Sequence, residues 1–320
     1  MADPSKNQQP AKPDQAQTRP APEQAQAKST GSAGGPEPTK KQKFYLFLFK
    51  VLPHHLISRV VYAVTHIRGP HVTPMIRWFI GRYGVAMHEA AEPDIKYYDT
   101  FNEFFTRELD METRPIAPGE NTIACPCDGT VSHTGALRSG AMLQAKGRAF
   151  SVLELLGGKK DLATHFANGR YTTIYLSPKN YHRVHMPISA NLVKMIHVPG
   201  KLFSVSDWVL QHVPRVFARN ERLIFVFQTA FGPMILIMVG AMNVSAIETI
   251  WTGQIRRSGK INEFDFTHTK KITLKGLEIG RFNMGSTVMM LFGEQMKFLP
   301  HIKSGQVVKL GQLIGHFPPE

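Results

Sequence analysis

Three short segments carry residue types that often do chemistry in proteins. One is Asp128-Gly129, a carboxylate beside a turn residue. A second covers residues 181–187, which read Tyr-His-Arg-Val-His-Met-Pro, so that two histidines stand three positions apart. Because histidine titrates near neutral pH, it can move protons in either direction. The third is Gly285-Ser286-Thr287, where a serine follows a glycine and opens a predicted strand.

Taken singly, each segment has an ordinary structural explanation. An Asp-Gly pair is usually a turn, and histidines in loops often hydrogen-bond to carbonyls. The serine does not stand in a Gly-x-Ser-x-Gly elbow, which argues against a typical hydrolase nucleophile. The spacing of His182 and His185 also fits metal binding. A metal-dependent hydrolase that recruits His197 or Cys127 as a further ligand is one alternative, although no acidic ligand stands at helical spacing, as in His-Glu-x-x-His.

The two cysteines, Cys125 and Cys127, are separated by a single proline. A disulfide across one residue has poor geometry, and two cysteines cannot form a framework. We therefore expect ordinary buried thiols and a reducing, cytoplasmic environment. No signal peptide is expected, because the N-terminus lacks a basic patch followed by an apolar run.

The charge of the chain predicts an anionic partner. Its 320 residues carry a formal net charge of +14, and its pI is about 9.8. Nucleic acid, anionic lipid and a charged small substrate all fit this balance. The cations concentrate in residues 40–88, where no Asp or Glu occurs. They include Arg59, Arg77 and Arg82.

Apolar residues recur at helical spacing in two parts of this cationic stretch. The first set is Leu56, Ile57, Val60, Val61 and Val64, and the second is Met75, Ile76, Phe79, Ile80 and Tyr83. The pattern predicts two short basic amphipathic helices separated by Gly69-Pro70. Such helices are typical of membrane surfaces, and packing on the protein core with a solvated basic rim is the alternative. Nucleic-acid binding is less favoured, because the cations interleave with an apolar face and no recognition motif is present.

The chain is predicted to have three regions. Residues 1–40 are rich in Pro, Gln and Ala and cannot bury enough apolar surface to fold, which predicts a disordered tail. Residues 41–110 form a helical membrane-surface region. Its third helix starts at Thr100, with Glu103 at capping-box spacing and an apolar face that runs to Leu109. Residues 111–320 form the catalytic domain.

Strand patterns dominate after residue 115. The clearest strands are 171–176, 223–227, 234–239, 271–274, 287–292 and 307–310. The apolar stretch 223–247 could be mistaken for a transmembrane helix, but Gly232-Pro233 near its middle favours a buried β-hairpin. Residues 305–315 alternate apolar positions with glycine turns and resemble barrel-sandwich folds such as lipoyl and biotinyl domains. The expected fold class is α+β, with N-terminal basic amphipathic helices before a mostly antiparallel, β-rich, barrel-sandwich-like catalytic domain.

Taken together, the segments resemble the prokaryotic, pyruvoyl-dependent phosphatidylserine decarboxylases, which are made as proenzymes. Residues 181–187 match that family's histidine segment in full, and Asp128-Gly129 matches its Asp-Gly segment. Residues 284–287, Met-Gly-Ser-Thr, match its Leu-Gly-Ser-Thr motif. Runs at 101–107, 217–222 and 231–234 are also similar, so the resemblance covers roughly residues 45–318. Met284 replaces the family's usual leucine, which conserves volume.

The resemblance implies a chain that cleaves itself. Ser286 would attack the carbonyl of Gly285, with His185 as the base and Asp128 orienting that histidine, as in a Ser-His-Asp triad. A long chain 1–285 and a short chain 286–320 would remain associated. The short chain would begin with a pyruvoyl group derived from Ser286, which would be both the cofactor and the Schiff-base site.

The implied reaction converts phosphatidylserine to phosphatidylethanolamine in phospholipid biosynthesis. The pyruvoyl group would accept electrons as carbon dioxide leaves, and His182 is the candidate acid that protonates the product. No metal, diffusible cofactor or nucleic acid is expected. Decarboxylases of soluble amino acids are a related alternative, and a non-catalytic anionic-lipid-binding protein is an alternative of a different class.

The resemblance also implies a location and partners. The chain would lie peripherally on the cytoplasmic face of the inner membrane, with its basic helices on the anionic surface. Because the edges of an open sheet need covering, a homodimer is compatible with this fold.

Overall fold

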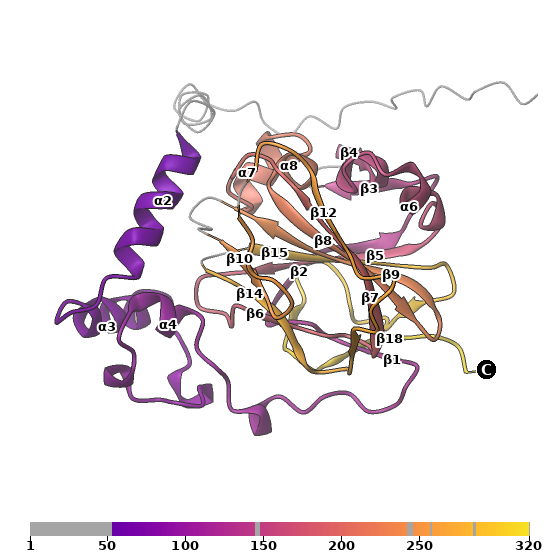
Figure 1. The fold of residues 1–320 in the computed structure, drawn as a ribbon. Coiled ribbons are helices and arrows are strands. Elements are labelled where there is room, and N and C mark those ends of the chain that lie inside the picture. The colour runs from indigo at the N-terminus through magenta and orange to yellow at the C-terminus, as the bar shows by residue number, and fades with distance from the viewer. Residues whose placement is uncertain (1–52, 145–147, 242–245, 257, 284–285, 320) are drawn as a thin grey trace, which may run out of the picture. The chain divides into compact units, whose positions relative to one another are not determined.

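The computed structural model describes residues 53–144, 148–241, 246–256, 258–283 and 286–319, all within the unit Pro38–Glu320. Helices gather in the N-terminal part of this region, and strands make up most of the rest (Figure 1). The predicted tail, residues 1–40, lies outside the described residues. So do the cleavage residue Gly285 and the neighbouring Met284. The predicted boundary at residue 110, between a helical region and a catalytic domain, stays a prediction.

The two predicted amphipathic helices are confirmed as α2, His54–Thr65, and α3, Val72–Tyr83. Gly69, at a φ of 146°, and Pro70 lie in the link between them. α3 buries Val72, Ile76 and Phe79 against an aromatic cluster that follows it in the chain. That cluster consists of Tyr98, Phe101, Phe104 and Phe105. None of the described helices is long and apolar enough to cross a lipid bilayer.

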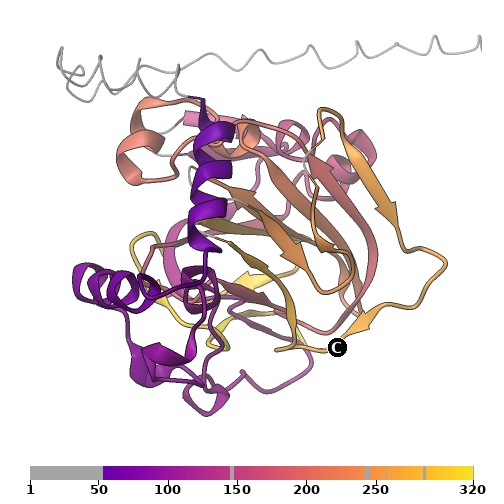
Figure 2. The ribbon, with the colours of Figure 1, turned by 60° about the vertical axis from the view of Figure 1, so that its left-hand side comes forward.

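The apolar face of α2 is turned outward. Leu56, Val60 and Val64 stand one helical turn apart, and each is about half exposed, Leu56 at 58%. Ile67, just after the helix, and Trp78 on α3 are also exposed, Trp78 at 64%. Figure 2 shows α2 as a rod beside the strands. We name Leu56, Val60, Val64, Ile67 and Trp78 the apolar stripe.

The third predicted helix is confirmed but shorter than expected. α4 spans Phe101–Phe105, and the Thr100 hydroxyl accepts from the N–H of Glu103. The Glu103 carboxylate accepts from Asp99 N–H. Leu109 does not belong to the helix face: it lies beyond the helix and pairs with Ala90 in an isolated bridge. Three single turns of 3-10 helix complete this region, η1 Met87–Glu89, η2 Ile95–Tyr97 and η3 Met111–Thr113.

The largest sheet is antiparallel, with strand order β12-β7-β8-β9-β15-β5-β2-β17 and with β13 paired to β7. Its strands span β12 Asn262–Asp265, β7 Ala190–Val198, β8 Arg222–Thr229, β9 Gly232–Gly240, β15 Ser286–Phe292, β5 Arg170–Leu176, β2 Gly129–Ala136, β17 Val307–Val308 and β13 Ile272–Thr273. The end strands β12 and β17 leave this sheet open within the described residues. The predicted α+β class is thereby confirmed, without a closed barrel.

The predicted hairpin in the apolar stretch is confirmed over residues 222–240. β8 and β9 pair from Arg222–Val239 to Thr229–Gly232, and Gly232 in the turn has a φ of 105°. Nearly every residue of the two strands is buried. Two other predicted strands are shorter than expected: 271–274 reduces to β13 and 307–310 to β17. The second ends early because the N–H of Leu310 donates to Asp128 and not to a strand.

Smaller sheets surround this one. A four-stranded sheet has the order β11-β10-β14-β6, and a three-stranded one has the order β1-β18-β16. Their strands are β11 Gly253–Gln254, β10 Ile247–Thr249, β14 Glu278–Phe282, β6 Arg183–His185, β1 Thr122–Ala124, β18 Leu313–His316 and β16 Lys297–Phe298. The described fold also contains a hairpin of β3 Ala141–Gln144 and β4 Arg148–Ser151. Its remaining helices are short: α5 Val152–Leu155, α6 Lys160–His165, α7 Asp207–His212 and α8 Val216–Arg219.

A buried amide fixes the end of the hairpin beside β15. Asn220 is fully buried, and its side chain donates to the carbonyls of Phe203 and Gly240 at 2.8 and 2.9 Å. Its oxygen accepts from Phe203 N–H. Gly240 in turn pairs with Ser286.

We expect Asn220→Ala to lower the free energy of unfolding by about 3 kcal/mol, because three buried backbone groups lose their partner. Urea unfolding would measure the change, with the exposed Gln228→Ala on β8 as the control. Equal midpoints for the two variants would contradict this role of Asn220.

Candidate active site

Ser286 is the first residue of β15, at the centre of the large sheet. It pairs with Leu176 of β5 on one side and Gly240 of β9 on the other. The residue is fully buried, and its hydroxyl has no hydrogen-bonding partner among the described residues. A serine hydroxyl that is neither solvated nor bonded is available for reaction.

The histidine segment reaches the strand that leads toward Ser286. β6 pairs with β14, with Val184 opposite Gly280. The carbonyl of His182 accepts from Phe282 N–H at 2.9 Å, four positions before Ser286 in the chain. On the other side, His185 N–H donates to the carbonyl of Pro126, two residues before Asp128. Backbone bonds therefore join the histidine segment to the Asp128 segment and to the strand before Ser286, while no side-chain hydrogen bond links Ser286 to His182, His185 or Asp128 within the described residues.

Gly129 has a steric reason to follow Asp128. A Cβ at this position would lie 2.5 Å from the carbonyl oxygen of Tyr175 and 2.6 Å from the Ile174 side chain. Only glycine lets β2 begin this close to β5. The Asp-Gly pair is thus a close strand contact that fixes the backbone beside the carboxylate.

Asp128 is held by an arginine that sequence reasoning missed. Arg114 Nε and Nη2 donate to the two carboxylate oxygens of Asp128 at 3.1 and 2.8 Å, and the N–H of Leu310 donates to one of them. Arg114 Nη2 also contacts Glu89 at 2.5 Å, and Glu89 pairs with Lys309. The hydrogen bond from Arg114 lowers the Glu89 pKa to about 2. No motif marked Arg114, because its partners lie far away in the sequence.

The expected contact between Asp128 and His185 is absent from the described structure. His185 Nδ1 lies 2.8 Å from the Gly276 carbonyl, and Nε2 lies 2.9 Å from the Tyr181 hydroxyl. Because a carbonyl only accepts, Nδ1 carries the proton and Nε2 is the basic nitrogen. Gly276 therefore orients the ring, which corrects the triad-like prediction. Asp128 acts on His185 only through its charge.

Burial keeps both histidines neutral. It lowers the pKa of His185, while the Gly276 carbonyl and the charges of Glu278 and Asp128 act in the opposite direction. His182 is fully buried and stacks on Phe105, with ring centroids 4.1 Å apart. Burial, assisted by the charge of Arg107, lowers its pKa to about 3. Backbone groups of Ser177 and Pro178 approach the ring, but neither nitrogen has a partner of good geometry among the described residues.

The other predicted ligands and thiols lie elsewhere. His197 on β7 pairs with Glu221 at 3.0 Å. Cys125 and Cys127 are free and buried, as expected, and burial raises the Cys125 pKa to about 12. Within the described residues no three His, Cys, Asp or Glu side chains gather as a metal site.

The chain is similar to known proteins over most of its length. The family model for phosphatidylserine decarboxylase matches residues 101–316, and a model described as PSD matches residues 46–84. The chain is similar to the phosphatidylserine decarboxylase proenzyme of Ectopseudomonas mendocina (strain ymp), at 43% identity over 86% of this chain and 99% of the relative. The proenzyme of Pseudomonas putida (strain W619) is 44% identical over 86% and 98% of the two chains. That of Psychromonas ingrahamii is 45% identical over 82% and 93%.

The neutral state of His182 makes stability depend on pH. The pKa of His182 in the folded state lies below its value near 6.5 in the unfolded state, so the unfolded state takes up a proton first as the pH falls. The free energy of unfolding is therefore unaffected by His182 above about pH 6.5 and decreases below it. We expect His182→Asn to reduce the slope of unfolding free energy against pH by about 1.4 kcal/mol per pH unit between pH 6 and 4. Denaturant unfolding across that range measures the slope. The exposed His301→Asn is the control, and an unchanged slope for His182→Asn would disprove a neutral buried histidine.

The family model covers residues 101–316 of this chain, and the relatives align with almost their whole length. This chain belongs to the phosphatidylserine decarboxylase family.

Proposed function

We propose that this chain decarboxylates phosphatidylserine to phosphatidylethanolamine, using a pyruvoyl group that it makes from its own Ser286. The observation that carries the proposal is the buried, unbonded hydroxyl of Ser286 at the centre of the large sheet. Its relatives bear the name phosphatidylserine decarboxylase proenzyme, and a proenzyme must be processed before it acts.

Processing begins at the Ser286 hydroxyl. Its oxygen attacks the carbonyl carbon of Gly285 and displaces the amide nitrogen, so the peptide becomes an ester. Elimination then removes the Cα proton of Ser286 and breaks the Cβ–Oγ bond, which frees the Gly285 carboxylate and leaves dehydroalanine at position 286. Water adds to this residue and ammonia leaves, which produces the pyruvoyl group. The products are chains 1–285 and 286–320.

His185 is the base in this proposal, and Nε2 is the nitrogen that takes the proton. The Tyr181 hydroxyl occupies this nitrogen and must give way to Ser286. Asp128 contributes its negative charge, which favours proton uptake by His185. Arg114 holds that carboxylate in place, because the two groups form a bidentate pair.

The surroundings of Ser286 fit the group that would replace it. The position is buried and flanked by β5 and β9, so a ketone formed there has little exposure to bulk water. When present, the pyruvoyl group supplies a ketone that accepts the substrate amine and withdraws electrons as carbon dioxide leaves. His182 stays the proposed proton donor. Because burial favours its neutral form, it must take up a proton after the anionic substrate has entered.

Self-cleavage is tested by intact mass spectrometry under denaturing conditions. We expect two chains from the wild type, the shorter being lighter by one ammonia than a serine-initiated 286–320. Ser286→Ala and His185→Gln should leave a single inactive chain. Tyr181→Phe is the matched control and should still cleave, because it frees His185 Nε2. Cleaved and active Ser286→Ala would refute the proposal.

We further propose that the apolar stripe and the cations around it bind the anionic cytoplasmic face of the inner membrane. Arg59, Arg77 and Arg82 are all exposed on α2 and α3, and the stripe is exposed on the same two helices. The substrate is itself an anionic lipid, so the enzyme must meet a surface of this charge. Each cation near such a surface contributes on the order of 1 kcal/mol.

Neutralising Arg59, Arg77 and Arg82 to Gln is therefore expected to weaken binding to phosphatidylserine vesicles at least about tenfold. Vesicle sedimentation measures the binding. Three other exposed cations, Lys160, Lys270 and Lys303, changed to Gln make a control of equal net charge. Equal losses in the two variants would show that net charge, and not this surface, determines binding.

The homodimer stays a prediction. β12 and β17 form the ends of the large sheet, and a second copy at one of them would cover its free backbone groups. Light scattering on the purified protein would decide between a monomer and a dimer.

A further inference from the structure

Four arginines are buried in the described part of the chain: Arg107, Arg114, Arg183 and Arg222. Arg114 and Arg183 each pair with two carboxylates. Arg222 donates to four backbone carbonyls, those of Glu154, Leu155, Ala218 and Asn220. Three of the four guanidinium groups are therefore well supplied with hydrogen-bond acceptors, and two of them also with opposite charges.

Arg107 is different. The residue is 4% exposed, and its Nε has no hydrogen-bonding partner in the described part of the chain. Its Nη1 reaches the carbonyl of Phe104 only at 3.5 Å, and its guanidinium lies 5.5 Å from the centre of that ring. Among the described residues no carboxylate pairs with it. Because arginine stays charged in proteins, this is a buried cation without an ion-pair partner among the described residues, and a bound anion would stabilise it.

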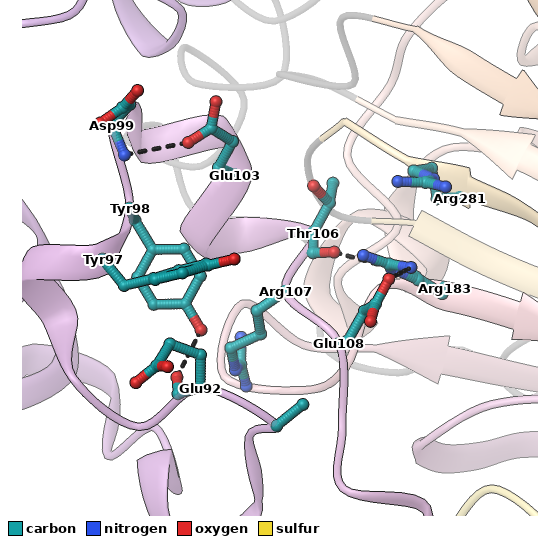
Figure 3. A pocket seen from close by; sticks show the side chains of 11 residues that line it. Glu92, Tyr97, Tyr98, Asp99, Glu103, Thr106, Arg107, Glu108, Arg183 and Arg281 are labelled. Atoms are coloured by element: carbon teal, nitrogen blue, oxygen red, sulfur yellow. Dashed lines mark hydrogen bonds and ion pairs between the residues drawn. The ribbon is translucent and has the colours of Figure 1, made fainter.

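Arg107 also lines a cavity of about 680 Å³ between the α4 region and strands β6 and β14. Figure 3 shows no bond from Arg107 to another drawn residue, whereas Arg183 is joined to Thr106 and Glu108. This volume suits a small polar ligand. The wall also carries four carboxylates, those of Glu92, Asp99, Glu103 and Glu108. Charges of both signs suit a zwitterionic headgroup better than free phosphate.

The cavity lies next to the proton-transferring histidine. Thr106 and Arg183 line it, and their chain neighbours Phe105 and His182 stack on each other. The positive charge of Arg107 lowers the pKa of His182. The negative charges of Asp128 and Glu89 act to raise the pKa of Arg107. Both carboxylates are bonded to Arg114, so they are not ion-pair partners of Arg107.

We propose that Arg107 binds an anionic group of the phosphatidylserine headgroup, its phosphodiester or its carboxylate, and so places the headgroup beside His182. The planar guanidinium can donate two parallel hydrogen bonds to either group. This inference rests on the proposed decarboxylase function. It has a consequence for catalysis: a bound anion offsets the Arg107 charge and thereby favours protonation of His182.

The test compares Arg107→Met and Arg107→Lys with the wild type in mixed micelles of phosphatidylserine, after mass spectrometry has established that each protein is cleaved. We expect Arg107→Met to raise KM at least about tenfold with a smaller change in kcat, and Arg107→Lys to recover part of the loss. Arg138→Met is the matched control. Arg138 is an exposed arginine that does not line the cavity, so its KM should stay within about twofold.

Two soluble inhibitors distinguish the anions. Glycerophosphoserine carries both groups, and glycerophosphoethanolamine carries only the phosphodiester. Weaker inhibition of Arg107→Met by both assigns Arg107 to the phosphodiester, and weaker inhibition by the serine compound alone assigns it to the carboxylate. Unchanged KM and inhibition would overturn the proposal, as would loss of self-cleavage in both Arg107 variants. An inactive but correctly folded wild type would instead refute the decarboxylase function itself.

Discussion

The ion pair between Arg114 and Asp128 is the interaction on which the arrangement of the site depends. It is almost fully buried, and it joins segments from four parts of the chain: η1 through Glu89, the start of β2 through Asp128, the C-terminal segment through Leu310, and Arg114 itself. Removing one partner of such a pair typically costs about 3–5 kcal/mol, because the other charge is left buried. The pair therefore links the helical region to the sheet that carries Ser286.

The same contact bears on how two chains would stay together after cleavage. The segment 286–320 contains β15, which is paired along its length with β5 and β9. It also contains Leu310 and Lys309, which bond to Asp128 and Glu89. A central strand cannot leave without breaking two ladders of hydrogen bonds, so breakage of one peptide bond at its start need not separate the chains. This placement explains physically how a proenzyme of this fold can process itself and keep its structure.

Burial disfavours the charged form of each basic group at the site, and hydrogen bonds to carboxylates decide which group stays charged. It keeps His182 and His185 neutral, while bidentate bonds to Asp128 keep Arg114 charged. Arg107 is buried with only one long hydrogen bond to the described residues, whereas each of the other three buried arginines makes several. The two ends of the proposed substrate correspond to two features of the described structure: an exposed apolar stripe edged by cations, and a polar cavity with a buried cation in its wall.

The sequence by itself determined the local elements and the family. Apolar spacing predicted α2 and α3, and Gly232-Pro233 distinguished a hairpin from a membrane helix, because these signals come from residues a few positions apart. The motifs at 128–129, 181–187 and 284–287 were sufficient to identify the phosphatidylserine decarboxylase family. Only the tertiary structure showed that Arg114 holds Asp128 and that Gly276 orients His185. It also showed that Arg107 forms no ion pair with a carboxylate among the described residues. These three features depend on contacts between segments far apart in the sequence and on which charged groups are buried. Neither property produces a recognisable pattern of residue types along the chain.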